Sequence, residues 1–211
     1  MENLNDLKSA IIAGQDVEAK VLVQKAIDSN RNPQDLVHDV LIPAMDEVGQ
    51  KFESGEYFIP EMLLAARAMK AAMELLQPLL AKSGIKPIAK VVLGTVQGDL
   101  HDIGKNLVAS MLEGGGFEVH DLGADVSPER FVQAVHDHSP ELVGLSALLT
   151  TTMPSMGHTL KAFETAGIRE KVKVMVGGAP VTIEFSDSIG ADGYAESASS
   201  AVALARSLLK S

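Results

Sequence analysis

The chain has 211 residues, of which 46% are apolar and 22% are charged, and its net charge is −10. This length and composition predict one or two domains with a sizeable core, and the acidic balance without a basic stripe argues against binding to nucleic acid or anionic membranes. The lack of cysteine excludes disulfides, thiolate nucleophiles, Fe–S ligation and cysteine-based zinc sites. No apolar run reaches the roughly 18 residues of a membrane span, and the N-terminus shows no secretory signal pattern, so we expect a cytoplasmic protein.

The first part of the chain has the apolar spacing of helices. Four segments carry this pattern: residues 4–13, 16–29, 31–52 and 60–81. Asp16 and Asn32 are candidate N-caps for the second and third helices, and Pro33 fits a first helical turn. Pro43 is expected to bend or interrupt the third helix. Residues 1–84 are therefore predicted to form a four-helix bundle.

After a linker over residues 82–90, in which Gly84 ends the helix and Pro87 prevents its return, strands alternate with helices. Strands are expected at residues 89–95, 117–123, 141–147, 172–178 and 192–195, and helices at 103–115, 127–139, 153–167 and 197–211. This alternation implies a parallel sheet with right-handed crossovers. Residues 85–211 are therefore predicted to form an α/β domain that binds ligands at the C-terminal ends of its strands.

The loop after the first of these strands reads GDLHDIGKNLV, from Gly98 to Val108. For His101 we consider three interpretations: a solvated loop histidine, a general base oriented by an aspartate, and a metal ligand whose second nitrogen donates to Asp99. A general base would need a nucleophile nearby, and no Gly-x-Ser-x-Gly motif is present. The remaining histidines form no evident metal-binding set with His101, so a single protein ligand suits a metal already held in a macrocycle.

These residues resemble the Asp-x-His-x-x-Gly signature of cobalamin-binding domains. The resemblance includes two further motifs at family spacing. Ser146-Ala147-Leu148 follows Gly104 after 41 intervening residues, and Gly177-Gly178 follows Leu148 after 28. The segment VGQKFESGEYFIPEMLLAARAM is similar to the helical cap that precedes the corrinoid domain of methionine synthase and of small methyltransferase corrinoid proteins. The resemblance therefore spans the chain and implies a helical cap followed by a flavodoxin-like, five-stranded Rossmann-like domain.

The resemblance also implies roles for individual residues. His101 would be the lower axial ligand of cobalt, Asp99 would hold its other nitrogen, and Ser146 would hydrogen-bond Asp99, so that both tune the ligand. The corrinoid-binding residues expected on this basis are Gly98, Asp99, Leu100, His101, Asp102, Ile103, Gly104, Ser146, Leu148, Thr150, Gly177, Gly178 and Ala198. Ser146, Thr150, the two glycines and Ala198 would contact the nucleotide tail.

Three cap residues, Phe52, Ile59 and Met62, align with positions that lie over the upper corrin face in the family. An apolar stripe at helical spacing is more often core, which is the competing interpretation. The resemblance predicts that all three face cobalt and not the interior of the bundle.

The function that the resemblance implies is that of a methyl carrier. One substrate-specific methyltransferase would load a methyl group onto Co(I), and a second would pass it to tetrahydrofolate or coenzyme M, with a reductive activation protein as a further partner. The carrier would not be catalytic by itself. The alternative is a cobalamin-dependent sensor or regulator, although such proteins place a DNA-binding segment before the bundle and a tryptophan over cobalt, and this chain has no tryptophan.

Overall fold

The computed structural model describes residues 2–82 and 87–210, and the chain divides into two compact units. The helical unit contains residues up to Ile88 together with Glu113–Gly116, and the α/β unit contains Ala89–Leu112 and Phe117 onward. The expected domain boundary at 84/85 and the expected helix end at Gly84 lie outside the described residues.

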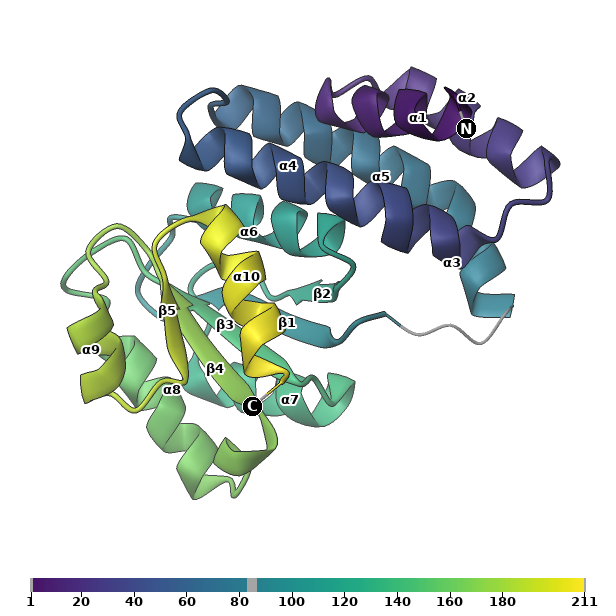
Figure 1. The fold of residues 1–211 in the computed structure, drawn as a ribbon. Helices are drawn as coiled ribbons and strands as arrows, with labels where there is room; N and C mark the ends of the chain where they lie inside the picture. The colour runs from purple at the N-terminus through teal and green to yellow at the C-terminus, as the bar shows by residue number, and fades with distance from the viewer. Residues whose placement is uncertain (1, 83–86, 211) are drawn as a thin grey trace. The chain divides into compact units, whose positions relative to one another are not determined.

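The helical unit is built of four helical segments, as the sequence predicts (Figure 1). Its elements are α1 (Glu2–Ile12), α2 (Asp16–Asp28), α3 (Pro33–Leu36), the π-helical η1 (Val37–Leu41), α4 (Ile42–Glu53) and α5 (Ile59–Lys82). Because α3, η1 and α4 are consecutive, they form one continuous helix with a π-helical turn inside it. The apolar stripes expected from the sequence form the core, with Leu7, Val23, Val48 and Met69 all buried.

The start of the third helix confirms one predicted cap, and the start of the second corrects another. The side chain of Asn32 accepts a hydrogen bond from the Gln34 amide at 3.0 Å, with Pro33 in the first turn. Asp16 is not the N-cap of α2, because Gln15 holds that position and makes no side-chain cap. Asp16 is instead the first helical residue, and its carboxylate pairs with Arg67 at 3.1 Å.

The predicted interruption at Pro43 appears as the π-helical turn immediately before it. Proline has no amide hydrogen, so the carbonyl four residues earlier, on Asp39, receives no helical hydrogen bond from it. The chain widens over Val37–Leu41, and the amide of Ile42 bonds the carbonyl of Val37, five residues back. The helix thereby continues through the proline with one wide turn.

The α/β unit contains the predicted five-stranded parallel sheet, and its strand order is β2-β1-β3-β4-β5. The strands are β1 (Lys90–Thr95), β2 (Glu118–Asp121), β3 (Leu142–Ser146), β4 (Lys173–Gly177) and β5 (Gly193–Ala195). The helices are α6 (Ile103–Gly114), α7 (Pro128–His138), α8 (Pro154–Thr165), α9 (Ile183–Ser188) and α10 (Ala198–Leu208), with a 3₁₀ turn η2 (Arg169–Lys171). Neither α9 nor η2 is predicted from the sequence, since each is only a turn or two long.

Helices cover both faces of the sheet, with α6 and α10 on one face and α7 and α8 on the other (Figure 1). Strands buried on both sides read as continuous apolar runs, as β1, β3 and β4 do. On the α7 and α8 face, alternate strand residues such as Val92, Val143 and Val174 pack with Phe131 and Phe163 in one cluster. This core fixes the sheet whose C-terminal edge carries the predicted site.

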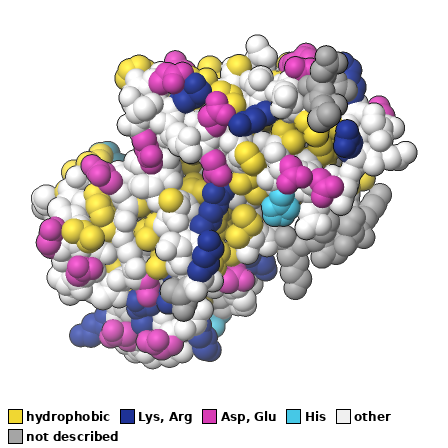
Figure 2. All heavy atoms as spheres, in the orientation of Figure 1, with side chains coloured by type: hydrophobic (Ala, Val, Ile, Leu, Met, Phe, Trp, Pro, Cys, Tyr) yellow, Lys and Arg dark blue, Asp and Glu magenta, His cyan; other side chains and the backbone are white. Residues whose placement is uncertain are grey.

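The surface carries the acidic excess of the sequence, since acidic side chains are scattered over both units on the face shown in Figure 2. A search of residues 2–82 and 87–210 finds no helix with the length and hydropathy required to cross a bilayer.

The core on the α7 face predicts the effect of truncating Phe131, which is fully buried. We expect Phe131→Ala to lower the free energy of unfolding by about 3–5 kcal/mol, because it removes an aromatic ring and leaves a cavity. Ile183→Ala is the control, since Ile183 is 58% exposed and should cost about 0.5 kcal/mol or less. Urea unfolding of the apoprotein measures both, and equal losses would contradict the assignment of Phe131 to the core.

Candidate functional site

The strand ends bring the predicted site residues to one edge of the sheet. Thr95, the last residue of β1, pairs with Ser146 of β3, and Ser146 pairs with Gly177 of β4. The loop that carries Asp99 and His101 follows β1 directly. Three motifs that lie far apart in the sequence therefore meet at the edge where parallel sheets bind ligands.

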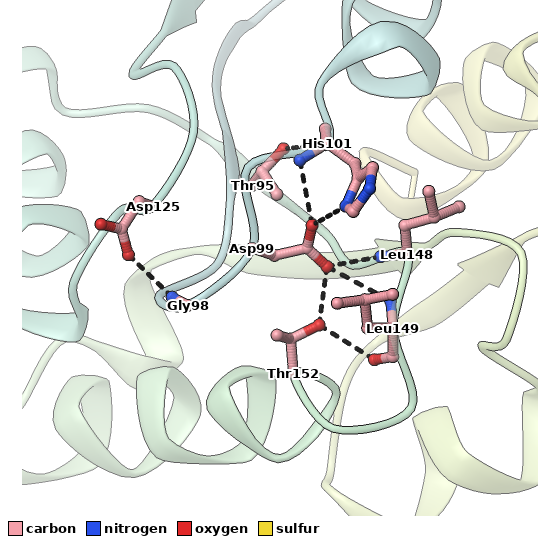
Figure 3. A network of polar contacts seen from close by, with 8 residues as sticks. All are labelled: Thr95, Gly98, Asp99, His101, Asp125, Leu148, Leu149 and Thr152. Atoms are coloured by element: carbon pink, nitrogen blue, oxygen red, sulfur yellow. Dashed lines mark hydrogen bonds and ion pairs between the residues drawn. The ribbon is translucent and has the colours of Figure 1, made fainter.

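Asp99 is the centre of a polar network in this loop (Figure 3). Its side chain is 0% exposed, and its two oxygens accept five hydrogen bonds. Oδ1 accepts from the backbone amide and from Nδ1 of His101, at 3.0 and 2.8 Å. Oδ2 accepts from the amides of Leu148 and Leu149, at 2.7 and 3.3 Å, and from Oγ1 of Thr152 at 2.6 Å. A buried carboxylate requires such donors, because unpaired burial of a charge is costly.

The network corrects one predicted contact. Ser146 was expected to hydrogen-bond Asp99, but the hydroxyl that reaches this carboxylate belongs to Thr152, six residues further on. Ser146 instead stays in the sheet, where its carbonyl accepts from the amide of Val96 at 3.0 Å. Thr152 could not be singled out from the sequence, because TTTMPS offers several hydroxyls and only the turn before α8 selects one of them.

The hydrogen bonds decide the ionisation of Asp99. Burial alone would raise the pKa of this carboxyl, but the hydrogen bonds from Thr152, Leu148 and His101 outweigh it and hold the pKa below its ordinary value. Asp99 is therefore an anion under ordinary conditions. Because an ionised carboxylate can only accept, Nδ1 of His101 carries the proton that faces it.

His101 consequently presents Nε2 to the outside of the network, and in the neutral imidazole this nitrogen carries the lone pair. Its side chain is 52% exposed, while its backbone is fixed by the Thr95 hydroxyl, which donates to the His101 carbonyl at 3.0 Å. No described residue makes a hydrogen bond to Nε2. An imidazole whose far nitrogen donates to a carboxylate is the arrangement commonly found in metal ligands.

The residues beside His101 form an exposed apolar rim. Leu100 and Ile103 are 77% and 78% exposed, and Leu148 is 43% exposed. Gly104 leaves open space where a side chain would be, since a Cβ there would meet nothing within 4 Å beyond its own helical turn. An apolar surface around one free nitrogen fits a large flat ring carrying a metal, so the residues present fit a corrinoid.

The start of α6 is fixed by a buried charge that the sequence motifs do not reveal. Lys105 is 2% exposed, and its ammonium contacts the carboxylate of Asp121 at the end of β2 and Oδ1 of Asn106. The half-buried Asp102 precedes this turn, and its carbonyl accepts from the Asn106 amide at 2.8 Å. These contacts hold the first turn of α6, and with it the end of the His101 loop.

The glycine pair at the end of β4 has a structural reason that does not depend on any ligand. Gly178 has φ +130°, and a Cβ there would lie 1.9 Å from the carbonyl oxygen of Ala147. A Cβ on Gly177 would lie 2.9 Å from the carbonyl oxygen of Ala195. Only glycine permits this approach of three strand ends.

The two other predicted tail contacts lie in different surroundings. Thr150 is exposed in the turn after β3. Ala198 is buried at the start of α10, directly after Ser197, whose side chain forms a capping box with Ser200.

Comparison with known proteins gives the family. A B12 binding domain family matches residues 89–203, and a second B12 binding domain family matches residues 4–77. The chain belongs to the B12-binding domain family. The predicted family, the helical part followed by a parallel sheet, and a corrinoid as the cofactor are confirmed by these matches.

Relatives of the B12-binding chain match it over almost its full length. It is 43% identical to dimethylamine corrinoid protein 1 of Methanosarcina acetivorans, over 99% of this chain and 98% of that protein. It is 42% identical to trimethylamine corrinoid protein 2 of Methanosarcina mazei, over 96% of this chain and 94% of that protein.

Two solved structures resemble the B12-binding chain. The crystal structure of a cobalamin-binding protein from Desulfitobacterium hafniense DCB-2 has a TM-score of 0.82 at 37% identity, covering 97% of this chain and 98% of that one. The methanol:cobalamin methyltransferase complex MtaBC of Methanosarcina barkeri has a TM-score of 0.88 at 30% identity, covering 99% and 80%. The second of these shows a relative in complex with a methyltransferase.

The helical unit of the B12-binding chain contradicts part of the predicted cap surface. Met62 is 0% exposed and belongs to the core of this unit, so it does not face outward as expected. Phe52 is half-buried, and Ile59 is 46% exposed. Two exposed apolar neighbours were not predicted: Phe58, at 65%, and Leu63, at 47%. Ile59 and Leu63 are four residues apart and lie together on the exposed side of α5, whereas Met62 is buried.

This arrangement predicts that two neighbouring substitutions affect the stability of the apoprotein very differently. Met62→Ala should lower the free energy of unfolding of the apoprotein by about 2–5 kcal/mol, because it empties a core position. Ile59→Ala should change it by about 0.5 kcal/mol or less, since that side chain is half in solvent. Chemical denaturation of both variants provides the measurement. An unchanged stability of Met62→Ala would contradict the assignment of Met62 to the core.

The hydrogen bond from Thr152 predicts a pH-dependent loss of stability. Thr152→Val removes a donor to a buried anion and should cost about 1.5–3 kcal/mol at pH 7. A carboxylate with a lowered folded-state pKa contributes stability above its unfolded pKa, near 3.8, and loses it as the pH falls through the folded value. The unfolded pKa is the same in both proteins, so the difference between wild type and Thr152→Val should stay constant while Asp99 is ionised in both and shrink only as the pH falls through the folded pKa of the variant.

Urea unfolding of the apoprotein at several pH values from about 7 down to about 2 tests this expectation. Thr150→Val is the matched control, because Thr150 is exposed in the same turn and should show no such difference. A loss in Thr152→Val that stays constant with pH would show that the threonine contributes packing alone.

Proposed function

We propose that the chain is the corrinoid-carrying methyl carrier of a methylamine-dependent methyltransferase system, with His101 as the axial ligand of cobalt. The observation that carries the proposal is the His101–Asp99 pair. Nδ1 is held 2.8 Å from a fully buried carboxylate, and Nε2 is free of hydrogen bonds to described residues at the edge of the sheet. A bound corrinoid supplies methyl transfer at cobalt, which no side chain of this chain could perform.

The residues of the chain control the ligand. Asp99 increases the basicity of the imidazole by accepting a hydrogen bond from its Nδ1–H, and the hydrogen bond from Thr152 keeps that carboxylate anionic. A change in the charge of the His101–Asp99 pair would therefore change how strongly Nε2 binds the metal as an electron-pair donor. Leu100, Ile103 and Leu148 are exposed beside that nitrogen and would exclude water from it once a corrinoid covers them.

The residues proposed to contact the nucleotide tail of the corrinoid are the same as those expected from the sequence. Ser146, Thr150, Gly177, Gly178 and Ala198 surround the ends of β3, β4 and the start of α10, and supply small side chains, hydroxyls and bare backbone. Phe52 and Ile59 of the helical unit are proposed to face the upper side of the corrin. Met62 has no part in this proposal.

The partners proposed are a methyltransferase specific for the methyl donor, a second methyltransferase for the acceptor, and a reductive activation protein. The relatives named for dimethylamine and trimethylamine support a methylamine as the donor, and the MtaBC complex supports direct docking of a methyltransferase. The carrier is not catalytic alone, because its own side chains supply only ligation and shielding.

The ligand assignment predicts a specific spectroscopic result. The apoprotein is reconstituted with hydroxocobalamin, reduced to Co(II), and examined by electron paramagnetic resonance with and without ¹⁵N-histidine. We expect histidine nitrogen to couple to cobalt in the wild type and in His136→Ala, whose exposed side chain lies on α7, but not in His101→Ala. Coupling to benzimidazole nitrogen, or coupling retained in His101→Ala, would contradict the assignment.

The donor is tested separately. Purified methyltransferases for dimethylamine, trimethylamine and methanol are each combined with the loaded carrier, and methylation of the corrinoid is followed by its absorption. We expect at least about tenfold faster methylation with a methylamine enzyme than with the methanol enzyme, since a mismatched docking surface costs on the order of 1.4 kcal/mol or more. The reverse order would replace the methylamine assignment and leave the axial ligand intact.

A further inference from the structure

Asp125 makes an unusual pair of contacts with the loop that carries His101. It lies after β2 in a left-handed backbone conformation, with φ +53°, which is unfavourable for residues other than glycine. Its Oδ1 accepts a hydrogen bond from the amide of Gly98 at 2.7 Å (Figure 3), and its own amide donates to the carbonyl of Asp99 at 2.9 Å. The two bonds fall on the peptide groups before and after the Gly98–Asp99 pair.

These two bonds restrain the part of the loop from which the Asp99 carboxylate projects. Gly98 itself has φ +87°, so this turn cannot rely on ordinary backbone preferences to hold its shape. Asp99 must place Oδ1 toward His101 and Oδ2 toward Leu148 and Thr152 at the same time. A rotation of either neighbouring peptide group would move one oxygen away from its partners.

Other contacts of the loop do not replace Asp125. The Thr95 hydroxyl binds the carbonyl of His101, and the Ser155 hydroxyl donates to the carbonyl of Gln97 at 3.0 Å. These contacts hold residues at the two ends of the turn, and the Asp99 amide closes it by donating to the Val96 carbonyl at 3.1 Å, but none of them holds the Gly98 amide or the Asp99 carbonyl. Asp125 alone, among the described residues, bonds to both the Gly98 amide and the Asp99 carbonyl.

We propose that Asp125 is a positioning residue for the axial ligand: it fixes the Gly98–Asp99 turn so that the Asp99 carboxylate holds His101 in its ligating orientation. This inference rests on the proposed function for the identity of the ligand. Asp125 acts through the loop backbone, to which both of its hydrogen bonds are made. The left-handed conformation is the cost of aiming both its carboxylate and its amide at the same turn.

Two substitutions separate the hydrogen bond from the backbone conformation. Asp125→Gly keeps the left-handed conformation at lower cost and removes the acceptor for Gly98. Asp125→Asn keeps both an acceptor oxygen and a tolerance for this conformation. Ser139→Gly is the control, because Ser139 also has a left-handed φ, +47°, at the end of α7, away from the His101 loop.

The first measurement uses the apoprotein. Amide hydrogen exchange at Gly98 should be about threefold to tenfold faster in Asp125→Gly than in wild type, as expected for the loss of one hydrogen bond. It should stay near wild type in Asp125→Asn and Ser139→Gly. The apo melting temperature of Asp125→Gly should fall by no more than a few degrees, because relief of the left-handed conformation offsets part of the cost of the lost hydrogen bond. Unchanged exchange at Gly98 would overturn the proposal at its first step.

The second measurement uses the corrinoid-loaded protein. The ratio of histidine-free to histidine-bound Co(II), read from the ¹⁵N-histidine coupling, should rise about threefold to tenfold in Asp125→Gly alone. The same ratio in Asp125→Gly and wild type would show that Asp125 only shapes the turn, which overturns the proposal. If wild-type cobalt carries no histidine at all, the proposed function fails instead, and the Gly98 exchange still reports whether Asp125 restrains the turn.

Discussion

The structure of the site depends on the burial of one carboxylate. Asp99 has no exposed surface, so its charge is tolerated only while five donors surround it. Two of those donors come from His101 in the same loop, and three come from the turn between β3 and α8, which can reach Asp99 only if the two strand ends lie side by side. The orientation of His101, which Asp99 holds, therefore depends on the pairing of β1 and β3 at this edge of the sheet.

The sheet and most of its helices could be predicted from the sequence because burial on both faces leaves a simple pattern. The central residues of β1, β3 and β4 form buried apolar runs, and amphipathic helices separate these strands. The short helix α9 was missed, since its six residues are too few for a helical period to be visible. Asp16 was expected to be a cap because its residue type suits one, but Gln15 occupies that position.

At the site, spacing predicted which residues meet but not which atoms bond. Asp99, His101, Ser146 and Gly177 lie at one edge, as the motifs indicated. The hydroxyl that donates to Asp99 was misassigned to Ser146. Which hydroxyl reaches this carboxylate depends on the path of the turn before α8, and that path could not be predicted from the local sequence. Met62 was misplaced for a related reason, since helical spacing gives a face but not the direction in which that face points.

The network around Asp99 also bears on whether the chain folds before it binds the proposed cofactor. Its hydrogen bonds to Leu148, Leu149 and Thr152 join residues 49 to 53 positions apart. Contacts of such separation form only after the intervening crossover has closed, and parallel pairing is slow for this reason. A nascent chain thus has no prepared histidine to offer, in contrast to small domains that metal ions fold directly. With His101 as the proposed ligand, corrinoid is therefore expected to bind only after the sheet is complete.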